Sequence, residues 1–155
     1  MAQNSVSASG SRSDLTMGSS LTRVVGFTAR HRYFKPDWSP EKNRVTFGEC
    51  TAEPGHTHDY RCTVTVGGEI DPVTGMVMDL GLLDRILAEE VTRPFHGKHF
   101  NLDVAAFAYG KTVPTCEAIA DYLHHRIARQ LPVGVRLIRI RIAEDETLSG
   151  EWTES

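Results

Sequence analysis

The fold is decided by residues 50–70, which read CTAEPGHTHDYRCTVTVGGEI. Over 57–70 apolar and polar residues alternate, which is the pattern of a β-strand with one buried face. The apolar positions are Tyr60, Cys62, Val64 and Val66. Because side chains alternate with a period of two, His56 and His58 project from one face of this strand. The stretch therefore predicts a half-buried strand that begins with a pair of neighbouring imidazoles.

A second strand is predicted upstream, over 21–33, where alternate residues again share a face. The residues on that face are Phe27, Ala29 and His31. The intervening segment, 35–55, is rich in Pro, Lys, Glu and Gly and is predicted to be a loop that delivers Cys50. The two strands and the loop would bring a third histidine and a thiol toward the His56–His58 pair.

Two helices are predicted in the middle of the chain. The first has helical spacing and is expected to end at Pro94, since proline disfavours helix at the residue before it. Its apolar residues are Leu80, Leu83, Ile86, Leu87 and Val91. The second helix opens at 114–117 with Thr115 as its N-cap. Its apolar face is formed by Ile119, Ala120, Leu123 and Ile127. The segment 95–113 is predicted to be a loop.

The C-terminal part returns to strict alternation. Over 135–143 one face carries three isoleucines and the other carries arginines, and Glu144 continues the isoleucine face. The isoleucines are Ile138, Ile140 and Ile142. A last short strand is predicted over 151–153. The order strand, strand, helix, helix, strand, strand indicates an α+β fold with a four-stranded antiparallel sheet. Its free edges predict oligomerisation, by closure of several sheets into a barrel.

The composition excludes several classes of protein. A chain of 155 residues fits one domain with a real core, and a net charge of −3 offers no basic surface for nucleic acid or membranes. No apolar run approaches the roughly 20 residues that span a bilayer. Three cysteines, an odd and small number, argue against a disulfide scaffold and favour reduced thiols in the cytoplasm.

The N-terminal 20 residues have a different composition from the rest. They contain seven serines but no apolar stretch of the kind found in a secretory signal, and their single arginine disfavours an organellar presequence. We predict a disordered serine-rich tail over 1–20, or an extension upstream of a start at Met17, followed by one folded domain over 21–155.

The histidines predict a metal centre. Three neutral imidazoles, from His31, His56 and His58, can bind a divalent ion and leave one tetrahedral position open for substrate or water. A nearby Cys50 of lowered pKa could then act as a base or nucleophile. Two alternatives remain at this point: three histidines without any metal, and Cys50 as a fourth ligand that would close the site.

Several sequence segments are shared, in order, with a known family. They are FTARH at 27–31, FGEC at 47–50, GHTHDY at 55–60, GEIDPVTGMVMD at 68–79, PTCE at 114–117 and LPVGV at 131–135. On these segments the chain resembles the 6-pyruvoyl-tetrahydropterin synthase family and its relative, 6-carboxy-tetrahydropterin synthase of queuosine biosynthesis. The six-residue step from Cys50 to His56 resembles the pyruvoyl branch. The resemblance implies the tunnelling fold, in which sheets join into a barrel, trimers pair as homohexamers and active sites lie between subunits.

The resemblance also implies roles for individual residues. Zn²⁺ would be bound by His31, His56 and His58, and Cys50 would exchange protons with the side chain of the substrate. The substrate-binding residues would be Glu117 and Glu144, which hold the pterin ring, together with Thr115 beside them. The alternatives are a solvated Glu144, with Glu146 as its rival, and a Glu117 that only complements the helix dipole.

One part of the family pattern differs in this chain. The family carries an Asp-His pair that helps the cysteine to move protons, whereas here His96-Gly97 occupies those positions. Either His96 or the nearby His99 is the candidate for the catalytic relay. The alternative is that both histidines only face solvent.

These observations predict a zinc-dependent lyase that converts 7,8-dihydroneopterin triphosphate, with elimination of triphosphate, into 6-pyruvoyl-tetrahydropterin. A second hypothesis is cleavage of the side chain, which would give 6-carboxy-tetrahydropterin. A third, of another class, is a pterin- and zinc-binding protein without catalysis. The expected partners are a small pterin and further copies of the same chain.

Overall fold

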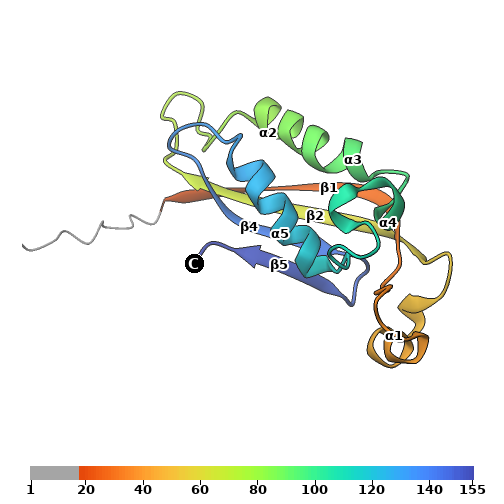
Figure 1. Ribbon diagram of the computed structural model, residues 1–155. Coiled ribbons are helices and arrows are strands. Elements are labelled where there is room, and N and C mark those ends of the chain that lie inside the picture. The colour runs from red at the N-terminus through yellow and green to blue at the C-terminus, as the bar shows by residue number, and fades with distance from the viewer. Residues whose placement is uncertain (1–17) are drawn as a thin grey trace, which may run out of the picture.

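Five strands form one mixed sheet in the computed structural model, which describes residues 18–155 (Figure 1). The strands are β1 (Ser19–His31), β2 (His56–Gly68), β3 (Lys98–His99), β4 (Arg136–Ala143) and β5 (Ser149–Thr153). Their order in the sheet is β3-β1-β2-β4-β5. The four predicted strands are present and pair antiparallel. The prediction of a purely antiparallel sheet is wrong, because the short β3 pairs parallel with β1.

The long β1–β2 pair forms the centre of the sheet. Its register runs from Ser19 opposite Gly68 to His31 opposite His56. The first strand thus begins two residues before its predicted start, because Ser19 and Ser20 still have partners at the end of β2. The predicted tail otherwise falls on residues 1–17, which lie outside the described residues.

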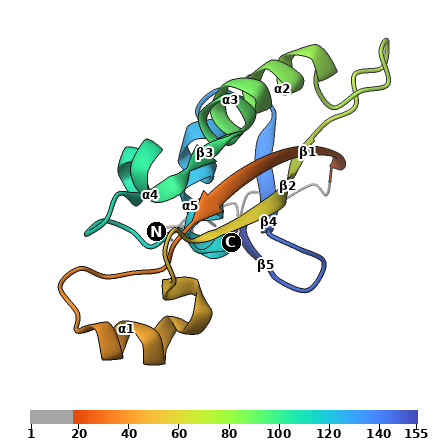
Figure 2. The ribbon, with the colours of Figure 1, turned by 90° about the vertical axis from the view of Figure 1, so that its right-hand side faces the viewer.

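The core lies on one face of the sheet, beneath the helices. The predicted inward residues of β1 and β2, from Phe27 to Val66, are at most 3% exposed. Helices α2 (Leu80–Leu87) and α5 (Cys116–Ala128) cover this face (Figure 2). The predicted apolar residues of α5 are all fully buried, and Thr115 caps the helix by accepting a bond from the N–H of Ala118. Both helices are therefore confirmed.

The predicted end of the first helix at Pro94 is wrong. After α2 the chain continues through a π-helical turn, Ala88–Thr92, into the short α3 (Arg93–Phe95), which contains Pro94. The N–H of Arg93 donates to the carbonyl of Ala88, five residues back. A π-helical turn is wider than an α-helical one, so it makes room for a ring that an uninterrupted α-helix would exclude.

The predicted isoleucine face of β4 is interrupted by a bulge. Ile140 and Ile142 are buried, but Ile138 is only partly buried and Leu137 takes its place in the core. The register slips at this point, so that Thr65 faces Arg139 whereas Val66 faces Leu137. One extra residue in a strand moves the following side chains to the other face, which the alternating sequence could not reveal.

Both predicted loops contain short helices. The first holds α1 (Pro40–Phe47) and a 3₁₀ turn over Gly48–Thr51, and the second holds β3, α4 (Phe100–Asp103) and a 3₁₀ turn over Ala105–Phe107. Helix α1 extends away from the sheet (Figure 2), and only Asn43 among its residues is buried. A helix without an apolar stripe gives no periodic signal. None of the helices in the described part of the chain is long and apolar enough to cross a membrane.

Candidate metal centre

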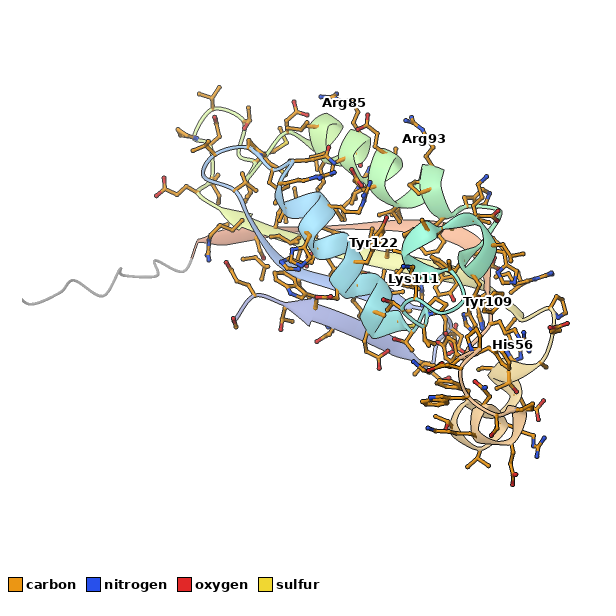
Figure 3. All side chains as sticks on the ribbon, viewed as in Figure 1. His56, Arg85, Arg93, Tyr109, Lys111 and Tyr122 are labelled. Atoms are coloured by element: carbon orange, nitrogen blue, oxygen red, sulfur yellow. The ribbon has the colours of Figure 1, made fainter. Side chains whose placement is uncertain are left out.

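Three histidines meet at one end of the sheet. His31 is the last residue of β1, His56 and His58 open β2, and the pairing of His31 with His56 brings them together. Their candidate ligand atoms all lie within 4.8 Å of one another. Figure 3 shows His56 at this end of the sheet, on the side where α1 projects. The predicted cluster is therefore present.

The histidines suit a metal ion better than an empty polar cluster. His31 is fully buried, and burial, followed by the neighbouring His58 and His56, lowers its pKa to about 3. It is therefore a neutral imidazole. The Nε2 atoms of His31 and His58 are buried without a hydrogen-bond partner in the described structure, which is costly unless something else binds them. Neutral imidazoles are ordinary ligands of Zn²⁺.

Tyr60 holds His31 in position. The phenol oxygen lies 2.5 Å from Nδ1 of His31, and the ring of Tyr33 stacks on the imidazole at 4.6 Å. A ring whose Nδ1 is engaged in this way presents Nε2 for coordination. The sequence predicts Tyr60 only as a core residue and gives no prediction for Tyr33. The period-two spacing from His58 to Tyr60 was the available signal for Tyr60.

Cys50 is held by backbone contacts beside the residues that directly follow His31. The N–H of Tyr33 donates to the carbonyl of Cys50 at 2.9 Å, and Nε of Arg32 donates to the carbonyl of Thr51 at 2.7 Å. The segment before β2 therefore lies with Cys50 against the end of β1. The pKa of Cys50 is not lowered, however. Partial burial, followed by the charges of Glu144 and Glu49, raises the pKa of the Cys50 thiol in the chain alone.

Glu144 lies over the histidines and is not a solvated strand end. It is 8% exposed, with Oε1 3.9 Å from Nε2 of His58 and Oε2 3.9 Å from Nδ1 of His31. The thiol of Cys116 donates to Oε2 at 3.7 Å. The rival residue, Glu146, is exposed. The carboxylate that enters the site is that of Glu144.

Glu117 lies at the rim of the same region. It is exposed in the first turn of α5, the helix that Thr115 caps. Burial raises the pKa of Tyr33, and nearby groups raise it further. Those groups are Glu144, Cys116, Cys50 and Glu117. The two predicted ring-binding carboxylates and both cysteines therefore act on the pKa of one tyrosine, whereas Thr115 caps the helix.

The two relay candidates occupy different places. Nδ1 of His96 accepts a bond from the N–H of Thr28 at 3.1 Å, and the exposed ring lies in a surface pocket with Asp59 and Arg61. His99 is half-buried, with Nε2 2.9 Å from the carbonyl of Pro54, and its proximity contributes to the low pKa of His31. Within one chain, therefore, His99 approaches the metal centre.

The fold and the site together define a class: an α+β protein with a cluster of three histidines that can bind a metal ion, together with a cysteine and a buried carboxylate. The model of the 6-pyruvoyl tetrahydropterin synthase family matches residues 20–154. The chain belongs to this family, as its resembling segments predicted.

Individual relatives agree with the family match. The 6-pyruvoyl tetrahydrobiopterin synthase of Homo sapiens is 39% identical over 126 residues, which are 81% of this chain and 85% of the relative. That of Poecilia reticulata is 40% identical over 81% of this chain and 84% of its own. The solved Caenorhabditis elegans 6-pyruvoyl tetrahydropterin synthase has a TM-score of 0.81 and 29% identity, and the match covers 88% of this chain and 96% of that one.

Gly55 controls the approach of the two strands that carry the histidines. Its φ is +102°, and a Cβ at this position would lie 2.2 Å from the carbonyl oxygen of His31. We expect Gly55→Ala to destabilise the fold by about 1–3 kcal/mol and to weaken zinc binding, because the strand ends must separate. Thermal unfolding and zinc titration measure both effects.

Gly75→Ala is the matched control for this change. Gly75 also has a positive φ, of +72°, but among the described residues no atom beyond its two chain neighbours lies within 4 Å of the Cβ that alanine would add. This variant should lose some stability and keep wild-type zinc affinity. If Gly55→Ala bound zinc as the wild type does, the close approach would not shape the metal centre.

Proposed function

We propose that the chain is a zinc-dependent 6-pyruvoyl tetrahydropterin synthase that acts on 7,8-dihydroneopterin triphosphate. The observation that carries this proposal is the meeting of His31, His56 and His58 with Cys50 and the buried Glu144 in a chain of this family. The reaction eliminates triphosphate and rearranges the substrate side chain. We place the enzyme in the cytoplasm, in keeping with its three free cysteines.

The metal would be held by the three histidines, with the unpartnered Nε2 atoms of His31 and His58 as natural ligands. A bound Zn²⁺ supplies a Lewis acid that acidifies C–H and O–H groups of the substrate side chain. Tyr60 keeps the imidazole of His31 oriented for this task.

Cys50 is proposed to give and take protons at the substrate side chain. In the chain alone its raised pKa keeps it a protonated thiol, so it starts as a proton donor. A cation bound by the neighbouring histidines would oppose the effect of Glu144 and Glu49 and favour the thiolate. A group that titrates near the working pH is suited to both directions of transfer.

Glu144 and Glu117 are proposed to hold the pterin ring. A carboxylate can accept two parallel hydrogen bonds, from a ring N–H and from the exocyclic amine beside it. Glu144 is preorganised, because it is buried and accepts a bond from Cys116. Glu117 is exposed at the start of α5 and is free to close over a bound ring, while Thr115 fixes that helix end.

As the residue that helps Cys50 to move protons we propose His99, if the site is built from one chain, because His99 lies near His31. His96 faces the other side of β1 and would serve only a site on a neighbouring chain. Such a neighbour is part of the proposal: the free edges at β3 and β5 suit closure of several sheets into a barrel, as a homohexamer.

The decisive experiment incubates the zinc-loaded protein with 7,8-dihydroneopterin triphosphate and identifies the products by mass spectrometry. We expect free triphosphate and 6-pyruvoyl tetrahydropterin. A 6-carboxy product would instead assign the chain to side-chain cleavage. Bound but intact substrate after long incubation would show a pterin-binding protein without catalysis, and either result would overturn the proposal.

A further inference from the structure

We propose a second metal site at the side of α5 next to β5, formed by Asp121, His124 and His125, for a divalent ion such as Zn²⁺. Asp121 precedes the two histidines by three and four positions, so it is a neighbour of each of them on the helix surface. Helix α5 lies over the β4–β5 part of the sheet (Figure 1). His124 is eight residues beyond Cys116, or about 12 Å along the helix axis, so this cluster is separate from the candidate metal centre.

The spacing of the side chains suits one ion. One ligand atom from each residue lies within 4.8 Å of the others, and Oδ1 of Asp121 is 4.0 Å from Nδ1 of His124. The two imidazole rings have their centroids 4.0 Å apart. An ion about 2.0–2.2 Å from each ligand needs ligand atoms roughly 3–4 Å apart, which small side-chain rotations achieve here.

His124 is already fixed in position. Its ring stacks on Trp152 of β5, with centroids 3.9 Å apart and an interplanar angle of 11°. Its Nδ1 atom is buried and has no hydrogen-bond partner in the described structure. A ring nitrogen that is held in place and lacks a hydrogen-bond partner is suited to coordinate a metal ion.

The surrounding charges do not oppose a cation. Asp121 supplies a negative charge, and its side chain is 69% exposed, so an ion can reach it from solvent. The nearest arginine in the helix, Arg126, is held in an ion pair by Glu90. Two imidazoles and one carboxylate favour Zn²⁺, Cu²⁺ or Ni²⁺ over Mg²⁺ and Ca²⁺, which prefer oxygen ligands.

The test is equilibrium dialysis of the full chain against micromolar Zn²⁺, with zinc per chain measured by atomic absorption. We expect the wild type to hold a second zinc ion that His125→Ala and Asp121→Asn both lose. Asp37→Asn, which removes another exposed carboxylate, is the matched control and should keep it. His58→Ala should lose the first ion and retain the second.

A spectroscopic measurement locates the ion. Cu²⁺ bound at His124 should quench the fluorescence of the stacked Trp152, and this quenching should disappear in His125→Ala. The proposal fails if the wild type holds only the ion that His58→Ala removes, or if His125→Ala keeps the second ion. Because neither readout depends on turnover, failure of the proposed enzyme activity would leave this test intact.

Discussion

His58→Ala is expected to remove zinc from the candidate metal centre and to lower turnover of 7,8-dihydroneopterin triphosphate by about 1,000-fold. A bound metal ion contributes several kcal/mol to the stabilisation of charge in the transition state, and each 1.36 kcal/mol corresponds to a factor of ten in rate. His58 is a better test than His31, because its side chain is 19% exposed whereas that of His31 is fully buried. Its removal therefore leaves the core intact.

Zinc content and steady-state turnover, measured on the same preparation, test this expectation. Thr57→Ala is the matched control. Thr57 lies between the two histidines of β2 and accepts a bond from Nε of Arg30. It should retain zinc and activity. A His58→Ala protein that turned over at the wild-type rate would exclude a catalytic metal at this place.

Cys50→Ala is expected to lower kcat by about 100- to 10,000-fold while zinc content and substrate binding stay near the wild-type level. Loss of a positioned proton-transfer group has an effect of this size on the chemical step alone. The backbone of Cys50 makes its contact with Tyr33 through the carbonyl oxygen, which alanine keeps. The loop should therefore retain its position.

Cys62→Ala separates this effect from the general loss of a thiol. Cys62 is fully buried in β2, and burial raises its pKa to about 12, so it should contribute to packing and not to chemistry. This variant should lose stability and keep kcat. Unchanged turnover in Cys50→Ala would support the hypothesis of a binding protein and contradict the proposed proton transfer.

Much of the fold could be predicted because its central elements have simple periods. The alternation that ends in Val64 and Val66 identified β2, and the helical spacing of Leu123 and Ile127 identified α5. The predictions failed at the points where the structure departs from these periods. A π-helical turn before Pro94 and a bulge at Ile138 each add one residue to a regular element, and only the tertiary structure decides where that residue goes.

The sequence could predict only the part of the site that depends on the pairing of β1 with β2. His31, His56 and His58 follow from the period and pairing of β1 and β2. The contact of Cys116 with Glu144 joins the start of α5 to the end of β4, which no local pattern encodes. The raised pKa of Cys50 likewise depends on its partial burial and on Glu144, a carboxylate 94 positions further along the chain.

The contacts that hold Cys50 have a consequence for tolerance to insertion. Bonds from Arg32 and Tyr33 to the backbone of Thr51 and Cys50 join the two ends of the segment 34–49. The position of Cys50 is therefore fixed by the residues that follow β1, and not by α1. The part of this segment around α1, which extends away from the sheet, can change in length at little entropic cost. Variation in that segment can therefore create new contacts with other chains while the geometry of the candidate metal centre stays the same.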